Sequence, residues 1–271
     1  MTYNFDAQID RRHSDSVKWS AYDDDVLPLW VADTDFRSPE PVIQALRERV
    51  EHGLFGYGGD PTELRDVVVE RLRTRCGWNV APEALVFISG VARGFHVTCR
   101  AFAKAGDGVL VQTPVYPPIL TAHAQAGLIS QEAALVRNRD GSYAVDFDVF
   151  ERAITESTRV FLLCNPHNPV GRAFRRDELE HMAEICLRHN VLICSDEIHC
   201  DVVYSPHKHI RIASISPEVA HNSITLMSPS KTYNIPGLKL AVAIIPNPEI
   251  RKTFEALQGP LGWIAAEGEG D

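Results

Sequence analysis

The sequence predicts an α/β fold in which helices cover both faces of a mainly parallel sheet. Short apolar runs alternate with segments of helical periodicity along most of the 271 residues. Strands are expected, in chain order, at 85–88, 108–112, 160–164, 191–195, 224–227 and 240–245. Helices are expected at 41–51, 62–76, 91–105, 147–154 and 176–189. Such alternation is typical of parallel sheets whose strands are buried on both faces.

Each expected strand is a short, nearly unbroken apolar run, as in Val160-Phe161-Leu162-Leu163-Cys164, whereas the expected helices show the 3.6-residue period. Open α/β sheets hold their active sites outside the carboxyl ends of the strands. Polar and glycine residues follow those ends here, namely Gly90, Tyr116, Asn168, Asp196 and Lys231. The sequence therefore predicts a site at one edge of the sheet.

Lys231 lies in the run Ser228-Pro229-Ser230-Lys231-Thr232-Tyr233-Asn234-Ile235-Pro236-Gly237, directly after an apolar strand. An amine in such a position can be partly desolvated and form a Schiff base, while neighbouring hydroxyls hold a phosphate. This combination suggests pyridoxal phosphate. The same residue types are also common in solvated surface turns, so this run alone leaves both interpretations open.

Two further polar turns follow apolar runs upstream. The turn Asn165-Pro166-His167-Asn168-Pro169 is rich in proline and would project an amide rigidly. Asp196 follows the run 191–195, where a carboxylate can pair with a protonated pyridine nitrogen and so make the ring a strong electron acceptor. Taken separately, the Asn-Pro repeats are common in loops, and an acid at the end of a strand, such as Asp196, is common as the N-cap of the next helix.

Taken together, these motifs resemble the fold type I pyridoxal-phosphate enzymes of the class I and II aminotransferase superfamily. The forms Asp196-Glu197-Ile198-His199 and Leu27-Pro28-Leu29-Trp30-Val31-Ala32-Asp33-Thr34-Asp35-Phe36, with the lysine run, are most similar to MalY/PatB-type cystathionine β-lyases, which are carbon–sulfur lyases. The resemblance extends from about residue 5 to about residue 257.

The resemblance implies a role for each matching residue. Lys231 would bind the cofactor as a Schiff base and move the substrate's α-proton, while Asp196 would hold the pyridine nitrogen. Asn168 would bind the phenolic oxygen of the ring, with His199 near the same edge. A structural role would be the default for an isolated histidine, but the motif reverses that preference.

The remaining matches concern the ring face and the phosphate. Tyr116 would stack on the ring, although a core-packing role is its ordinary alternative. Gly90, Val91 and Ala92 begin a helix whose backbone N–H groups would bind the phosphate, completed by Ser228 and Ser230. Tyr57, in Gly56-Tyr57-Gly58-Gly59, would reach the neighbouring subunit's phosphate, which implies a homodimer. Its ordinary alternative is a turn aromatic between glycines.

We expect residues 1–40 to form an N-terminal segment, 41–258 the cofactor-binding large domain, and 259–271 an atypical tail.

The sequence departs from the family pattern in two respects. The family's small C-terminal domain, with its arginine for the substrate carboxylate, is expected to be absent from a shortened chain. Lys239 stands where many such enzymes have a phosphate-binding arginine, and a lysine offers a point charge without a bidentate fork.

Composition indicates a soluble cytoplasmic protein. The chain is 45% hydrophobic and 23% charged, as in ordinary globular domains. No apolar stretch approaches the ~20 residues that span a bilayer, and the first residues do not resemble a secretion signal. The net charge of −9, without a long basic run, argues against nucleic acid or an anionic membrane as partner. Six scattered cysteines indicate reduced thiols rather than a disulfide framework or a metal site.

The activity that the resemblance implies is β-lysis of an amino-acid thioether such as cystathionine, releasing a thiol, pyruvate and ammonia. A class I/II aminotransferase is the first alternative, because the shared motifs serve both reactions. An inactive remnant or a binding module is the second, because the C-terminal domain is expected to be missing.

Overall fold

A computed structural model describes residues 3–56, 58–59 and 61–268, with side chains as far as residue 258. The chain divides into two compact units. The arm unit comprises Met1–Asp60 and Pro229–Lys239, and the sheet unit comprises Pro61–Ser228 and Leu240–Asp271. The lysine run therefore leaves the sheet unit after Ser228 and returns to it at Leu240.

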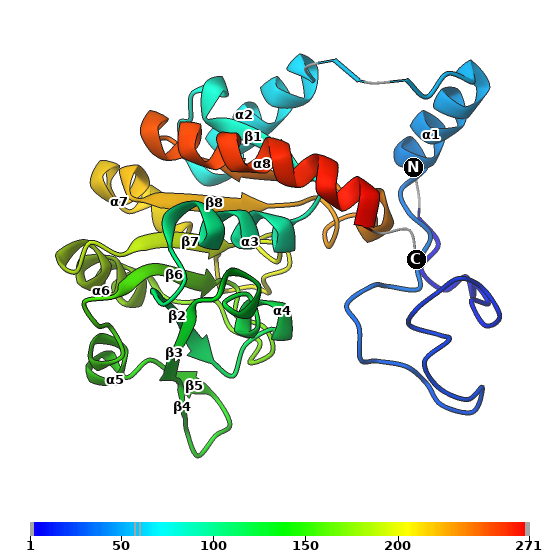
Figure 1. The fold of residues 1–271 in the computed structure, drawn as a ribbon. Coiled ribbons are helices and arrows are strands. Elements are labelled where there is room, and N and C mark those ends of the chain that lie inside the picture. Colours follow the sequence, from blue (N-terminus) through cyan, green and yellow to red (C-terminus); the bar gives the residue numbers. More distant parts are fainter. Residues whose placement is uncertain (1–2, 57, 60, 269–271) are drawn as a thin grey trace. The chain divides into compact units, whose positions relative to one another are not determined.

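The sheet unit is built on a seven-stranded sheet (Figure 1). Its strands lie in the order β1 (Leu85–Ile88), β9 (Ala241–Ile244), β8 (Ser223–Met227), β7 (Leu192–Asp196), β6 (Thr158–Cys164), β2 (Gly108–Thr113) and β3 (Ile129–Ala134). The five strands from β8 to β3 are parallel, whereas β9 runs antiparallel to both of its neighbours. A separate hairpin pairs β4 (Val136–Arg137) with β5 (Tyr143–Ala144). The prediction of a mainly parallel sheet is confirmed.

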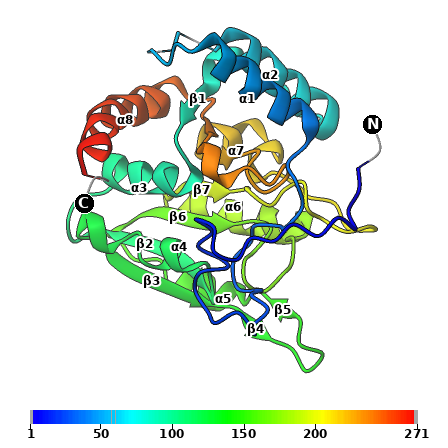
Figure 2. The same ribbon diagram turned by 90° about the vertical axis from the view of Figure 1, so that its right-hand side faces the viewer.

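Both faces of this sheet are covered, as predicted, because successive strand residues point to opposite sides. On one face Val160 and Leu162 pack in a cluster with Phe95 of α3 (Val91–Phe102) and Phe254 of α8 (Pro248–Gly268). On the other face Phe161 packs with residues of α5 (Phe147–Arg152), α6 (Arg176–Arg188) and α7 (Pro217–His221). Figure 2 shows α3 and α8 side by side along the first face.

The close approach of α3 to the sheet depends on Gly94. A Cβ atom at this position would lie 2.6 Å from Cδ2 of Leu226 in β8 and 2.9 Å from Cδ1 of Ile88 in β1. No real side chain fits at those distances unless the neighbours move. Gly94 therefore allows the first turn of α3 to pack closely against β8 and β1.

Each predicted helix and strand is present in the structure. Helix α2 (Thr62–Cys76) and strand β1 have the predicted bounds, and the other predicted helices and strands are displaced by at most a few residues at either end. The prediction missed the edge strand β3, the β4–β5 hairpin, the short helices α4 (Pro117–Leu120) and α7, the long helix α8, and the 3-10 turns η1 (Pro82–Ala84), η2 (Ala124–Ala126), η3 (Ile212–Ser214) and η4 (Pro236–Leu238). Residues 259–268, expected to be an atypical tail, continue α8.

The arm unit has one helix, α1 (Glu40–His52), among its described residues outside the lysine run. An ionic cluster stabilises the segment before this helix. Arg11 binds Asp33 at 2.9 Å and Asp35 at 2.8 Å, and the ammonium of Lys18 lies 2.7 Å from Asp35. Burial raises the pKa of Asp35, but hydrogen bonds from Lys18, Trp19 and Arg11 outweigh it and lower the pKa overall, so this carboxylate stays ionised.

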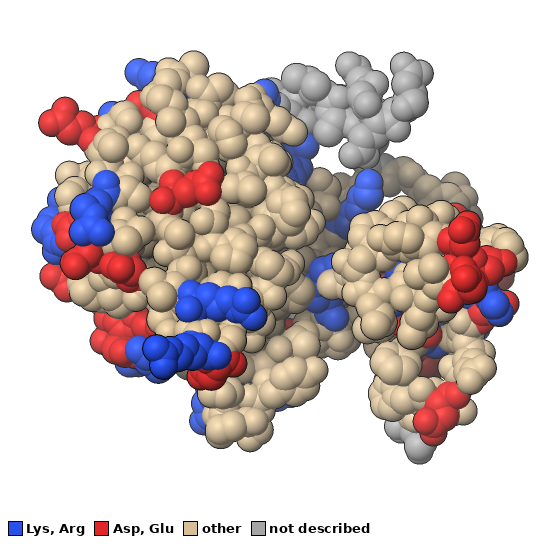
Figure 3. Space-filling view, turned by 90° about the horizontal axis from the view of Figure 1, so that it is seen from below, with Lys and Arg blue, Asp and Glu red and all other residues tan. Residues whose placement is uncertain are grey.

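Charges of both signs are interspersed on the face shown in Figure 3, where acidic and basic groups lie close together. Ion pairs lie along α6, such as Arg176 with Glu180 and Arg188 with Glu184. Among the helices described, none is both long and apolar enough to cross a membrane. The six cysteines are free and four of them are buried; burial raises the pKa of Cys99 to about 12.

Candidate cofactor site

The carboxyl ends of the strands gather the predicted residues of the sheet unit at one edge. Asp196 is the last residue of β7 and is in register with Cys164 of β6 and Leu226 of β8. The turn with Asn168 follows β6, and the turn with Tyr116 follows β2, which is parallel to β6. Strand β1 runs parallel to β8, because both are antiparallel to β9, so Gly90 belongs to the same edge.

A backbone hydrogen bond joins the turns of Tyr116 and Asn168. The N–H of Tyr116 donates to the carbonyl of Asn168 at 2.9 Å. Beside it, Nε2 of His167 lies 2.8 Å from the carbonyl of Pro114 and donates to it. These two bonds hold an aromatic ring and an amide close together at the ends of neighbouring strands.

The two amides of the Asn165–Pro169 turn differ in what they bind. Asn165 is fully buried, donates from Nδ2 to the carbonyl of Ile210 at 3.1 Å, and accepts from the N–H of Phe174 at 3.0 Å. It therefore anchors the turn. Asn168 is partly exposed, which leaves it as the amide of this turn that can meet a ligand.

Asp196 has a largely buried carboxylate, with 6% of the residue exposed. Its Oδ1 accepts the backbone N–H of Ile198 at 3.0 Å, and its carbonyl accepts the N–H of Asn165 at 2.9 Å. Burial and the nearby charge of Asp196 raise the pKa of Tyr116. The phenol therefore keeps its proton at neutral pH and lies within the electrostatic field of this carboxylate.

A buried ion cluster next to Asp196 was missed by the sequence analysis. Glu197 has no exposed surface; its Oε2 lies 2.8 Å from Nε2 of His209 and 3.5 Å from Nε of Arg211. Its Oε1 accepts the hydroxyl of Ser195 at 3.2 Å. The charge of Glu197 is therefore compensated by Arg211 and His209. The carboxylate of Asp196 accepts a different hydrogen bond, from the backbone of Ile198. The only signal in the sequence was a second acid next to Asp196.

Helix α3 begins at the same edge. Gly90 is its N-cap residue and supplies no side-chain cap, and a Cβ atom there would meet nothing within 4 Å. The first backbone N–H groups of a 12-residue helix, at Val91 and Ala92, can bind an anion in such open surroundings. Ser228, which follows β8, donates its hydroxyl to the carbonyl of Leu240 at 2.6 Å.

His199 follows Asp196 by three residues and is partly exposed; its carbonyl accepts the N–H of Val202 at 2.9 Å. The other predicted residues belong to the arm unit. Lys231, the fourth residue after β8, donates from Nζ to the carbonyl of Ala32 at 2.8 Å, and Ser230 is buried. Tyr57 lies outside the described residues.

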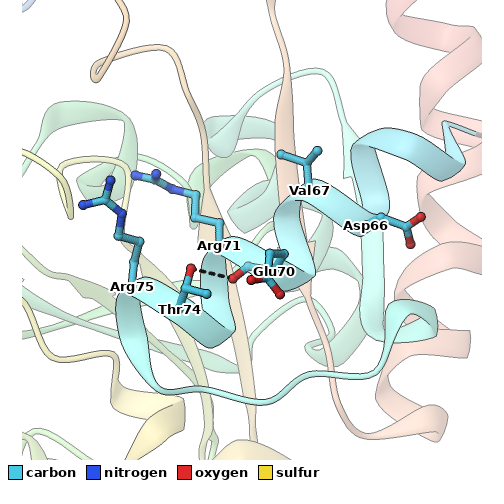
Figure 4. A pocket seen from close by; sticks show the side chains of 6 residues that line it. All are labelled: Asp66, Val67, Glu70, Arg71, Thr74 and Arg75. Carbon is cyan, nitrogen blue, oxygen red and sulfur yellow. Dashed lines mark hydrogen bonds between the residues drawn. The ribbon is translucent and has the colours of Figure 1, made fainter.

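Helix α2 carries a hollow of its own (Figure 4). Its volume is about 430 Å³, and side chains of α2 alone line it, namely Asp66, Val67, Glu70, Arg71, Thr74 and Arg75. No predicted site residue lines it.

The residues at the strand ends suit pyridoxal phosphate in their chemistry. A buried carboxylate can hold a protonated ring nitrogen, a protonated phenol and an amide can meet the ring, and an uncapped helix start can bind the phosphate. In the sequence, the lysine run follows β8 directly.

Comparisons with known proteins identify the family of this chain. The family model for aminotransferase class I and II matches residues 24–262. Cystathionine beta-lyase PatB of Bacillus subtilis is 41% identical over 259 residues, which cover 93% of this chain and 67% of PatB. The chain thus spans about two thirds of the length of that relative.

Two solved structures have nearly the same fold. The crystal structure of OvoB is 47% identical with a TM-score of 0.90, covering 94% of this chain and 68% of that one. Cystalysin from Treponema denticola, whose structure contains pyridoxal 5'-phosphate, is 33% identical with a TM-score of 0.91, covering 95% and 67%. By its family match, its identities and its fold, this chain belongs to the class I and II aminotransferase family and, within it, is similar to the PatB-type cystathionine β-lyases.

Proposed function

We propose that this chain carries the cofactor-binding part of a pyridoxal-phosphate-dependent carbon–sulfur β-lyase. Its substrates would be amino-acid thioethers such as cystathionine, and its products a thiol, pyruvate and ammonia. The similarity to PatB and to cystalysin supports this choice. The observation that carries it is Asp196, a largely buried carboxylate at the end of a central strand whose acidic neighbour, Glu197, is already paired.

We assign the binding roles as follows. Asp196 would pair with the ring nitrogen, Tyr116 would stack on the ring, and Asn168 would donate to its phenolic oxygen near His199. The phosphate would be held by the start of α3 and by hydroxyl groups, namely through Gly90, Val91, Ala92, Ser228 and Ser230. When bound, the cofactor draws electrons away from the substrate's Cα and so makes its proton acidic.

The chain's own groups would then manage two protons. The Asp196 carboxylate keeps a proton on the ring nitrogen, because a buried anion stabilises the cation beside it. The amine of Lys231 would hold the cofactor covalently and, once displaced by the substrate, take the proton from Cα. An amine acts as a base only when neutral, so its surroundings must favour loss of the ammonium proton.

A homodimer in the cytoplasm is part of the proposal. Tyr57 would bind the phosphate of the neighbouring subunit, as the family resemblance implies. About a third of the length of PatB lies outside its match to this chain, and the rest of the site, including the group that binds the substrate carboxylate, is expected there.

Product analysis tests the proposed reaction. The purified protein is loaded with pyridoxal phosphate and given cystathionine, and thiol and pyruvate are measured together. We expect both in equal amounts, loss of both in Lys231→Ala, and no change in the control Lys208→Ala, which alters an exposed lysine. Transfer of the amino group to a 2-oxo acid without thiol would instead support an aminotransferase. Cofactor binding without either product would support a non-catalytic binding module.

A further inference from the structure

Asn234 joins the lysine run to the N-terminal segment through four hydrogen bonds. Its Oδ1 accepts the N–H of Thr34 at 2.9 Å, and its Nδ2 donates to the carbonyls of Thr34 and Phe36, each at 2.9 Å. Its own carbonyl accepts the hydroxyl of Ser38 at 3.2 Å. The side-chain amide thus binds both backbone groups of Thr34, as a neighbouring strand would, although the two residues are 200 positions apart.

The backbone at Asn234 also restricts which residue can stand there. Its φ of 54° lies in the left-handed region, which asparagine tolerates better than most residues. Glycine would accept this backbone but has no amide, and glutamine has the amide on a longer side chain. Asparagine therefore satisfies both the backbone and the hydrogen bonds at this position.

The side chain of Lys231 binds the N-terminal segment, and its backbone lies within a turn of the lysine run. Its Nζ donates to the carbonyl of Ala32, two residues before Thr34. Its backbone lies inside a turn closed by the bonds from Tyr233 N–H to Pro229 and from Ile235 N–H to Ser230, each 3.0 Å long, and Asn234 stands between the two donors.

The segment 32–36 is held from its other side by the ionic cluster of the arm unit. Arg11 binds the carboxylates of Asp33 and Asp35, and Lys18 binds Asp35 and the carbonyl of Asp33. The side chain of Lys18 is 6% exposed, whereas those of Arg11 and Asp35 are 23% and 36% exposed. The acceptor of the Lys231 amine is therefore part of a fixed support.

We infer that Asn234 is a positioning residue for Lys231, because it fixes the 32–36 segment that holds the lysine amine on the Ala32 carbonyl. The inference rests on the proposed function only in giving Lys231 its chemical role. The hydrogen-bond network itself involves no cofactor, so it can be tested without one.

The test uses the complete chain without cofactor. Acetic anhydride at limiting amounts labels each lysine at a rate set by its accessibility and its deprotonated fraction, and peptide mass spectrometry reports each rate against Lys208 in the same sample. In Asn234→Gly, which keeps the left-handed backbone, we expect the relative rate at Lys231 to rise by about tenfold, the scale of losing one or two hydrogen bonds. Amide hydrogen exchange of Thr34 should accelerate in parallel.

Asn190→Gly is the matched control, since Asn190 also has a left-handed backbone, with φ 55°, but lies after α6 in the sheet unit. It should change neither the rate at Lys231 nor exchange at Thr34. A rate at Lys231 in Asn234→Gly within experimental error of the unmodified chain would overturn the inference. So would an equal rise in Asn190→Gly.

Asn234→Asp provides a milder change and a rescue. The ionised carboxylate still accepts from the Thr34 N–H but cannot donate to the carbonyls of Thr34 and Phe36. Protonation at a pH near the ordinary Asp value of about 4 restores one donor. Exchange at Thr34, corrected for the intrinsic pH dependence, should therefore approach that of the unmodified chain as pH falls. Exchange that stays fast at low pH would contradict the role of the donor.

Failure of this inference is distinguishable from failure of the proposed function. Labelling and exchange report the Asn234 network even in a chain that binds no cofactor. Borohydride reduction in the presence of pyridoxal phosphate reports attachment at Lys231 irrespective of Asn234.

Discussion

The backbone N–H of Tyr116 donates to the carbonyl of Asn168 at 2.9 Å, across turns that are 52 positions apart in sequence (168 − 116). This bond joins the turn after β2 to the turn after β6, two strands that pair in parallel. An aromatic ring and a partly exposed amide are thereby fixed at the edge where Asp196 ends β7. The proposed site depends on this edge being rigid before a ligand arrives.

Replacing Asp196 with asparagine should remove the charge that stabilises a protonated ring nitrogen. We expect Asp196→Asn to lower kcat by about 100-fold or more, with a smaller effect on KM, because the loss is felt mainly in the transition state. Steady-state kinetics on a thioether measures both constants. Asp177→Asn, at an exposed position, is the control; equal kinetics for Asp196→Asn and the unmodified protein would argue against the assigned role.

Replacing Glu197 with glutamine should destabilise the sheet unit. The change leaves Arg211 and His209 buried without their anion, and breaking a buried ion pair from one side typically costs about 3 kcal/mol or more. Urea unfolding followed by circular dichroism measures the difference in unfolding free energy. The control Glu184→Gln alters a side chain that is 71% exposed and should change stability by less than about 0.5 kcal/mol. Equal losses in the two variants would contradict the buried cluster.

His167 should make the protein less stable in mild acid. Burial lowers its pKa from the usual 6.5 and outweighs the backbone carbonyls of Pro114 and Cys164, which favour the protonated ring. Below pH 6.5 this histidine is protonated in the unfolded chain but stays neutral in the folded chain. The unfolding free energy therefore decreases as the pH is lowered, by at most about 1.4 kcal/mol per pH unit from this group.

Unfolding in urea between pH 7 and pH 5 checks this prediction. His167→Gln, whose amide can still donate to Pro114, should show a shallower fall than the unmodified chain, whereas His13→Gln at an exposed position should not. Parallel curves for His167→Gln and the unmodified chain would show that this histidine is not the cause.

The sequence predicted those parts of the fold where local pattern and burial agree. Strand β1 and helix α2 were placed at their observed bounds because an unbroken apolar run and a 3.6-residue period are local signals. Strand β3, Ile129–Ala134, was missed because it is an edge strand whose residues Ser130, Gln131 and Glu132 lack an apolar pattern. The antiparallel direction of β9 is a property of the whole sheet and leaves no trace in its own residues.

The candidate site was predictable in part for the same reason. Asp196 follows an apolar run directly and Asn168 lies in the turn after another, so their place at strand ends could be inferred from neighbouring residues. The pairing of Glu197 with His209 and Arg211 was not predictable, because these residues approach Glu197 only through the fold. The contact of Asn234 with Thr34 likewise has no local signal.

Trapping the cofactor on its lysine shows whether Lys231 is the residue that binds it. The protein is incubated with pyridoxal phosphate, reduced with borohydride and digested, and the modified peptide is identified by mass spectrometry. The account predicts a single pyridoxyl group on Lys231, and none in Lys231→Ala. Modification spread over Lys104, Lys208 and Lys252, or no modification at all, would contradict it.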